Sequence, residues 1–165
     1  MRKLLYVIVI LFTIHCSLFT ISCSTIDCPL QSSVSVQYVV RDKAGKELAL
    51  TDSLTVISNR QNGDTVILNR LYQKSSFSLP ISYSHPEDIL FFHFKDNDTI
   101  MVDTVWLKKE DYPHFESVDC NAAFFHEITD VRHTRHYIDS LVLLNRSVNY
   151  DQTNIHFRLV PKRND

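Results

Sequence analysis

One cysteine near the start of the chain has the sequence context of a lipid-modified residue. Cys23 follows Ser22, and a small residue at that position suits the narrow pocket of the peptidase that cuts before a lipidated cysteine. The thiol of Cys16 follows the bulkier His15 and fits this processing less well. Thr20 departs from the pattern, because leucine is usual three positions before the cysteine. We predict lipidation of Cys23, with a plain signal peptide and an ordinary thiol as the alternative.

Cys28 and Cys120 are the other two cysteines that cleavage before Cys23 would leave. In an oxidising compartment such a pair can form a disulfide. Closing a loop of that length contributes about 4 to 5 kcal/mol in the chain-entropy model. The bond would fasten the segment behind the anchor to the body of the protein. Two buried thiols are the alternative.

Three histidines lie close together in the sequence and raise the question of a metal site. His126, His133 and His136 fall within eleven residues. A zinc site needs three or four ligands that converge in space, and Arg132 and Arg135 in the same stretch would repel a cation. We expect separate histidines, with no metal and no other cofactor. A histidine-based metal-binding protein or enzyme of the periplasm is the alternative function.

Motifs of well-known enzyme classes are missing from the sequence. It contains no Gly-x-Ser-x-Gly, no glycine-rich phosphate loop and no His-Glu-x-x-His. The run Asp96-Asn97-Asp98 suggests calcium, but it lacks the Gly and the Glu that an EF-hand requires. We interpret this run as a polar turn and predict that the protein is not an enzyme.

A triplet of Asp, Ser or Thr, and an aliphatic residue occurs five times, where the composition predicts about one occurrence. Structurally, Asp can close a turn while the next two residues begin a strand. The triplet also resembles the acceptor site of O-glycosylation on exported proteins of Bacteroidetes. Both interpretations stay open. The candidate acceptors are Ser53, Thr65, Thr99, Thr104 and Ser140, with Thr65 and Thr99 favoured because they lie beside predicted turns.

The first 22 residues have the pattern of a secretory leader. Arg2 and Lys3 precede an apolar run over 4–14, which is shorter than the about 20 residues of a membrane span. An uncleaved anchor extending to residue 21 is the alternative, and it would bury His15. Cleavage leaves 15 basic against 19 acidic residues, so the mature net charge is −4. This balance offers no electrostatic basis for binding nucleic acid.

Alternating apolar and polar residues predict strands through the rest of the chain. Asn62-Gly63 predicts a hairpin turn between two of them, and Pro80 predicts an edge strand or a bulge because it removes a ladder donor. The charged segment 108–113 is expected to be a connection that can hold one helical turn. The predicted strands cover 34–40, 54–57, 66–68, 77–83, 89–94, 99–107, 124–129, 138–144 and 155–159.

About eight to ten short strands, with no convincing helical stretch, predict an all-β fold. The expected architecture is a two-layer antiparallel β-sandwich, immunoglobulin-like or similar. Large aromatic residues should fill the space between the layers. We expect Phe92, Trp106, Phe124 and Phe157 to be largely buried.

Several short motifs follow one another in a fixed order along the chain. Among them are Asp27-Cys28-Pro29, Leu79-Pro80-Ile81-Ser82-Tyr83, Val118-Asp119-Cys120 and Val148-Asn149-Tyr150-Asp151. With these motifs the chain resembles an uncharacterised family of small Bacteroidetes lipoproteins, described as a domain of unknown function. The resemblance implies a Gram-negative envelope and favours both the lipid anchor and the Cys28–Cys120 pair. It implies no activity.

These observations predict a signal peptide over 1–22, a lipidated tether over 23–32 and a single β-sandwich domain over 33–165. We expect a cell-envelope protein held to the membrane by its lipid, acting as a non-catalytic binding or structural module. The expected partners are the membrane and an envelope protein. Surface export of lipoproteins in these bacteria resembles a tag system, in which a run of acidic residues close behind the lipidated cysteine directs the protein outward. Here Asp27 is the only acidic residue between Cys23 and Cys28. An outer-membrane location facing the periplasm is therefore expected.

Overall fold

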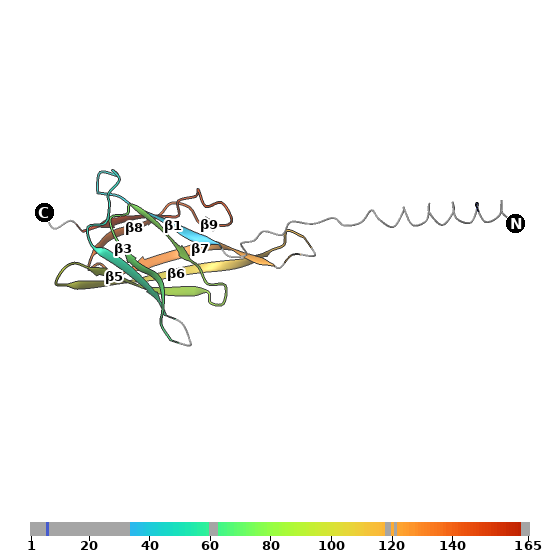
Figure 1. The fold of residues 1–165 in the computed structure, drawn as a ribbon, viewed down its shortest axis with the longest axis horizontal. Helices are drawn as coiled ribbons and strands as arrows, with labels where there is room; N and C mark the ends of the chain where they lie inside the picture. Colours follow the sequence, from blue (N-terminus) through green and yellow to red (C-terminus); the bar gives the residue numbers. More distant parts are fainter. Residues whose placement is uncertain (1–5, 7–33, 60–62, 118–119, 121, 163–165) are drawn as a thin grey trace.

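The computed structural model describes Tyr6 and residues 34–59, 63–117, 120 and 122–162. Two β-sheets lie face to face (Figure 1), with strand orders β4-β1-β10-β8 and β3-β2-β5-β6-β7-β9. Within these residues, no helix has the length and apolarity to cross a membrane. The ten strands are β1 (Ser35–Val40), β2 (Ser53–Ser58), β3 (Thr65–Leu71), β4 (Ser76–Pro80), β5 (Glu87–Lys95), β6 (Ile100–His114), β7 (Ala123–His133), β8 (Ile138–Leu143), β9 (Ser147–Val148) and β10 (Phe157–Pro161).

An aromatic layer joins the two sheets. Tyr38 on β1 stacks between Phe77 and Phe157, with ring centroids 4.8 Å and 5.1 Å away, and meets the edge of Phe92 on β5 at 6.0 Å. All four side chains are buried. Burial of such large rings supplies much of the apolar area that stabilises a sandwich. The predicted all-β, two-layer fold is confirmed.

One strand pair differs from the antiparallel arrangement that was expected. β1 pairs with β10 in parallel, so that Tyr38 lies opposite Phe157, while the other strand pairs are antiparallel. More than a hundred residues separate these two strands in the sequence. A separation of that length leaves no tight hairpin to impose an antiparallel direction.

Two local predictions are confirmed. β2 and β3 form an antiparallel hairpin, and Gly63 before β3 has a φ of 107°, a conformation that glycine adopts without steric cost. β4, which ends at Pro80, lies at the edge of the four-stranded sheet. Proline is tolerated there because an edge strand leaves ladder donors unused.

The prediction of a connection over 108–113 is wrong, because β6 continues through it to His114. Its charged residues suggested a solvent-exposed link, but Lys109 and Asp111 point inward and pair with each other. β9 was also missed, since two residues are too short to show alternation.

The expected burial of four aromatic residues holds for Phe92 and Phe157 only. Trp106 is half-buried on the outer face of β6, where the Arg132 guanidinium lies 5.4 Å from its ring. Phe124 is half-buried and stacks on the exposed Tyr83 at 5.0 Å. Both are large apolar residues at alternating positions, and the pattern does not say which of the two strand faces is turned to the core.

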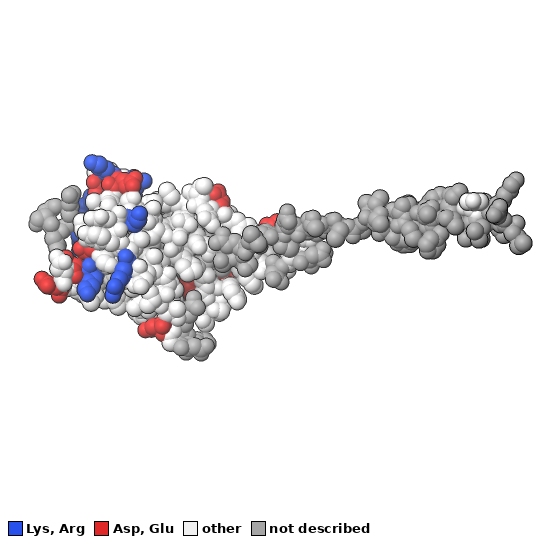
Figure 2. All heavy atoms as spheres, viewed as in Figure 1, with Lys and Arg blue, Asp and Glu red and all other residues white. Residues whose placement is uncertain are grey.

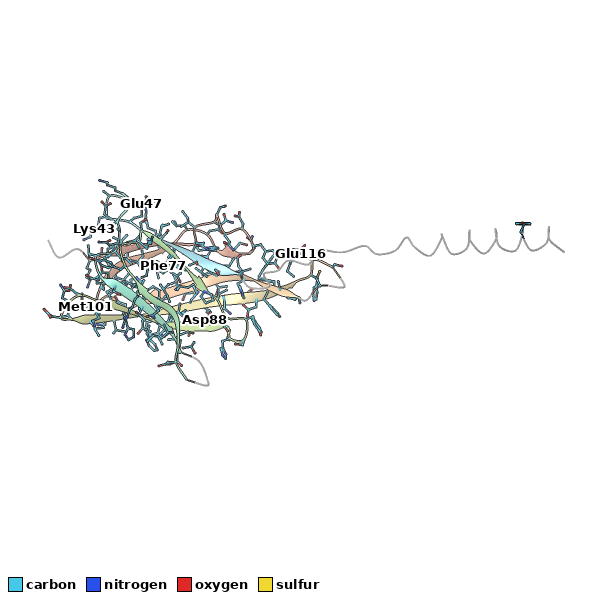
Figure 3. All side chains as sticks on the ribbon, in the orientation of Figure 1. Lys43, Glu47, Phe77, Asp88, Met101 and Glu116 are labelled. Atoms are coloured by element: carbon cyan, nitrogen blue, oxygen red, sulfur yellow. The ribbon has the colours of Figure 1, made fainter. Side chains whose placement is uncertain are left out.

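The two ends of the sandwich are distinct (Figures 1 and 3). One end, called the near end, holds the start of β1 and Glu116. The opposite end, called the far end, holds Met101 and Lys162.

Candidate functional site

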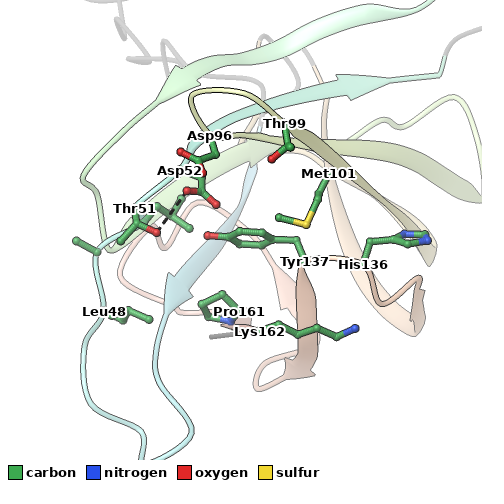
Figure 4. A pocket seen from close by; sticks show the side chains of 12 residues that line it. Leu48, Thr51, Asp52, Asp96, Thr99, Met101, His136, Tyr137, Pro161 and Lys162 are labelled. Carbon is green, nitrogen blue, oxygen red and sulfur yellow. Dashed lines mark hydrogen bonds between the residues drawn. The ribbon is translucent and has the colours of Figure 1, made fainter. Parts of the chain in front are cut away.

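A pocket of about 360 Å³ opens at the far end of the sandwich (Figure 4). Its size falls in the range of small-molecule sites. Four chain segments form it: the connection from β1 to β2, the β5–β6 turn, the connection from β7 to β8, and the chain after β10. The lining residues are Leu48, Ala49, Leu50, Thr51, Asp52, Asp96, Thr99, Met101, His136, Tyr137, Pro161 and Lys162.

Tyr137 lies in the middle of this pocket, which we call the main pocket. Its ring stacks on the buried Phe94, with centroids 3.9 Å apart, so the ring is fixed by the core. Its hydroxyl points toward Thr51 and Asp52 (Figure 4). Burial, followed by the Asp52 carboxylate, raises the pKa of Tyr137 to about 12. The hydroxyl therefore stays protonated at neutral pH and acts as a hydrogen-bond donor.

A buried carboxylate holds the segment that carries Tyr137. Asp103 on β6 is fully buried, and its Oδ2 accepts hydrogen bonds from the backbone N–H groups of Tyr137 at 2.8 Å and Ile138 at 2.7 Å. Its Oδ1 accepts from the Thr134 hydroxyl and from the His136 N–H, both at 2.7 Å. One side chain thus fixes the whole connection from β7 to β8.

The protonation state of Asp103 follows from these bonds. Burial alone would raise the pKa of its carboxyl group, but the donors from His136, Ile138, Thr134 and Tyr137 outweigh burial and lower the pKa. Hydrogen bonds that favour the charged form have this effect. Asp103 is therefore an ionised structural group behind the pocket wall.

A second hollow of about 440 Å³ adjoins the main pocket and shares Thr51 and Asp96 with it. We call this hollow the side pocket and the two together the far-end groove. Asp96 stands at the junction, with its Oδ1 accepting from the Asn97 N–H at 2.6 Å. The side pocket is lined by Thr51, Ser53, Tyr72, Lys95, Asp96 and Asn97.

Tyr72 is presented at the side pocket by an unusual backbone. Its side chain is 54% exposed, and the residues around it, Arg70 and Gln73, have positive φ values of 51° and 54°. A non-glycine residue in this conformation costs about 1 to 2 kcal/mol. The segment is held by the Gln73 N–H, which donates to the Leu50 carbonyl at 3.2 Å, and by the Arg70 N–H, which donates to Thr55 Oγ1 at 3.2 Å.

Both signs of charge meet at the far end. On the face shown in Figure 2, Lys and Arg gather with Asp and Glu at this end, and the middle of the sandwich carries few charges. The described residues that line the groove include two carboxylates, Asp52 and Asp96, and two ammonium groups, Lys95 and Lys162. The Lys162 ammonium also donates to the Arg135 carbonyl.

Comparison with known protein families gives one match. A model described as Family of unknown function (DUF6452) covers residues 53–161. The chain belongs to this family. No curated protein and no solved structure matches it. The matched span of this DUF6452 chain contains most of the groove, including Tyr72, Asp96 and Tyr137.

The three histidines considered as metal ligands have separate partners in the DUF6452 domain. His126 Nδ1 donates to Asp111 at 2.6 Å, His133 Nδ1 donates to the Thr134 carbonyl at 2.7 Å, and His136 lies beside Asp103 at 3.2 Å. Within the described part of the chain, no group of three or more His, Cys, Asp or Glu side chains is placed to share a metal ion.

His126 belongs instead to a buried polar cluster toward the near end. The Lys109 ammonium is fully buried and donates to Asp111 at 3.0 Å and to the His85 carbonyl at 2.6 Å. Burial lowers the pKa of His126 despite the neighbouring Asp111 carboxylate. Burial also raises the pKa of Asp88, the fourth member of the cluster. We assign this cluster to stability, because Lys109 and Asp111 neutralise each other.

The five candidate glycosylation acceptors lie on different parts of the DUF6452 domain. Thr65 and Thr99 are exposed, while Ser53, Thr104 and Ser140 are half-buried. Ser53 and Thr99 line the groove. Asp103, next to Thr104, has the structural role described above, so turn and strand formation alone does not explain that triplet. The predicted lipidation site Cys23 and the disulfide partner Cys28 lie outside the described residues, and the Cys28–Cys120 bond stays a prediction.

The groove residues themselves were not singled out from the sequence as a site. In the sequence, Asp52 belonged to a repeated triplet, as did Asp103 behind the groove wall, and Asp96 belonged to a predicted turn. Tyr72 and Tyr137 were not singled out by any pattern. A usable signal was present: Arg-His-Tyr-Ile at 135–138 breaks the alternation just before a strand. Such breaks mark segments that need side-chain partners for their backbone groups.

Proposed function

We propose that this protein is a lipid-anchored, non-catalytic binding module of the cell envelope. The position of the groove carries the proposal. It lies at the far end of the sandwich, while β1, the first described strand after Cys23 in the sequence, begins at the near end. A lipid on Cys23 would therefore hold the near end toward the membrane and turn the groove away from it, where an envelope partner or ligand can reach it.

The groove chemistry favours binding over catalysis. Among the described lining residues, Tyr137 is a protonated donor, and Asp52 and Asp96 are acceptors. General acid–base catalysis needs a group whose pKa lies near the working pH, and the raised pKa of Tyr137 moves its hydroxyl away from that range. The proposed location is the outer membrane, with the domain facing the periplasm.

The test uses the intact lipoprotein in detergent-solubilised envelopes of cells that produce it. Ala49 is exposed and lines the main pocket, so Ala49→Trp fills the pocket without touching the core. Ala44 is equally exposed, in the turn after β1, and Ala44→Trp serves as the matched control.

We expect pull-down with the wild type and with Ala44→Trp to recover a ligand or protein that Ala49→Trp does not recover. Recovery that is the same for all three proteins would place binding elsewhere and contradict the proposal. Protease added to intact cells tests the orientation: digestion of the domain while a periplasmic control survives would show surface exposure instead.

A further inference from the structure

We propose that the far-end groove binds a neutral saccharide, with Tyr72 as the stacking surface and Asp52 and Asp96 as hydroxyl acceptors. This inference rests on the proposed function and adds the chemical class of the ligand. Three observations support it: the charge balance of the lining, its mixture of donors and acceptors, and an exposed aromatic ring held at the rim.

The charge balance argues against a strongly charged ligand. The described residues of the groove carry two negative charges, on Asp52 and Asp96, and two positive charges, on Lys95 and Lys162. A polycation would meet both ammonium groups, and a polyanion would meet both carboxylates. A neutral ligand with many polar groups avoids either repulsion. Its polar groups can form hydrogen bonds with the carboxylates and with the ammonium groups. Such charge-assisted hydrogen bonds are stronger than those between neutral groups.

The donor and acceptor types match sugar hydroxyl groups. A hydroxyl both donates and accepts, so it can donate to a carboxylate while it accepts from an ammonium or amide group. The side pocket supplies all of these within one hollow: Thr51, Lys95, Asp96 and Asn97. The Tyr137 hydroxyl interacts with Asp52 and offers its oxygen as a further acceptor in the main pocket, in a position fixed by ring stacking on the core.

Tyr72 supplies the apolar surface that a sugar ring needs. The C–H groups on one face of a pyranose can lie against an aromatic ring, and Tyr72 is 54% exposed at the side pocket. The positive φ values of Arg70 and Gln73 bracket it, and the backbone bonds to Leu50 and Thr55 hold this conformation. Residues kept in unfavourable backbone conformations cluster at functional sites.

The shape of the groove also fits more than one sugar unit. The main pocket and the side pocket measure about 360 Å³ and 440 Å³ and share Thr51 and Asp96. Each is within the range that holds a small ligand. A short oligosaccharide would place one unit against Tyr72 and the next beside Tyr137.

The experiment is an NMR titration of the full mature chain, whose mass confirms that Ser53 and Thr99 carry no glycan. The probes are maltotriose, cellotriose, mannotriose and triacetylchitotriose, each at millimolar concentration. Trilysine and trigalacturonate serve as charged probes of similar length. We expect at least one neutral trisaccharide to shift the amide resonances of Thr51, Asp96 and Asn97.

Two matched pairs of variants assign the site. Tyr72→Ala should weaken binding about tenfold, which corresponds to the loss of one aromatic contact, while Tyr83→Ala should not. Tyr83 is 66% exposed but lies away from the groove, in the β4–β5 connection. Asp96→Asn should weaken binding as well. Asp98→Asn should not, since Asp98 is in the same turn but is not among the described residues that line either pocket.

The outcomes separate this inference from the proposed function. Absence of shifts with all four neutral trisaccharides overturns the saccharide assignment. Groove shifts with trilysine or trigalacturonate alone also overturn it, while leaving the far-end groove as a binding site. A trisaccharide that binds Tyr72→Ala and Tyr83→Ala equally well would show that the groove is not its site.

Discussion

Replacing Asp103 by Asn should destabilise the domain far more than the small change in shape suggests. Asn keeps one acceptor oxygen but turns the other into an NH₂ group, which cannot accept from an N–H. Either oxygen of Asp103 accepts two hydrogen bonds at 2.7 to 2.8 Å. With the NH₂ group at the Oδ2 position, the Tyr137 and Ile138 N–H groups both lose their acceptor. With the NH₂ group at the Oδ1 position, the His136 N–H loses its acceptor, the Thr134 hydroxyl can still accept from the amide, and the remaining bonds are no longer charge-assisted. Each bond to a charged group contributes about 1.5 to 3 kcal/mol.

The expected loss is therefore about 3 to 6 kcal/mol of unfolding free energy, against a total of about 5 to 15 kcal/mol for a typical domain. Urea unfolding can be followed by the fluorescence of Trp106, the only tryptophan, which lies on the outer face of the same strand. With an m-value of about 2 kcal/mol per M, the midpoint should fall by about 1.5 to 3 M.

Asp64→Asn is the matched control for this substitution. Asp64 opens the same triplet, Asp-Thr-Val, but its side chain is exposed. Exposed positions without special partners change stability by about 0.5 kcal/mol or less. Equal midpoints for Asp103→Asn and Asp64→Asn would refute the assignment of Asp103 as the residue that holds the connection from β7 to β8.

The pH dependence of stability gives a second test of the role of the Asp103 carboxylate. The lowered pKa of Asp103 means that its contribution is present above the unfolded-state pKa of about 3.9 and is lost as the pH falls through the folded-state value. The wild type should therefore lose stability steeply below about pH 4. Asp103→Asn should show a flatter acid limb, and an identical slope in both proteins would contradict the reasoning.

Three further predictions concern the anchor, the crosslink and a buried histidine. Cys23→Ala should release the chain from the membrane fraction or leave a heavier precursor; unchanged fractionation and mass would show that Cys23 carries no lipid. Cys28 and Cys120 should resist an alkylating agent in the unreduced native protein, and modification of both thiols would disprove the bond. Burial lowers the pKa of His156, whose Nδ1 accepts from the Gln37 N–H at 3.0 Å. The unfolded state then binds more protons, so stability should fall as the pH drops from about 7 to about 5, and a constant urea midpoint over that range would be inconsistent with this burial.

Alternation in the sequence was enough to predict the layers and most strands, because a sheet with one buried face needs an apolar residue at every second position. The pattern in 34–40 shows this directly, with Val34, Val36, Tyr38 and Val40 all buried. The same rule failed in β6. There the exposed face carries Ile100 and Val102, and the buried face includes Asp103.

The failure in β6 has a physical cause. Alternation identifies two faces but not which one is turned inward when both contain apolar residues. An aspartate is expected at the surface, because burying its charge is costly unless hydrogen-bond partners compensate for it. Its partners lie 31 to 35 residues further along the chain, so no local pattern reveals them. The main pocket could not be predicted for the same reason. Its four segments are far apart in the sequence and meet only in the folded domain.

The repeated triplet shows how one short pattern can serve three different environments. In Asp64-Thr65-Val66 the acid is exposed, in Asp52-Ser53-Leu54 it lines the groove, and in Asp103-Thr104-Val105 it is buried behind the groove wall. Strand initiation accounts for the triplets that begin at Asp52 and Asp64, whereas Asp103 lies within β6 and holds the connection from β7 to β8. Asp103 and Asp52 are linked through Tyr137, because one holds its backbone N–H and the other faces its hydroxyl. A change at Asp103 should therefore weaken ligand binding in the groove without any contact to the ligand, and Asp64→Asn should leave binding unchanged.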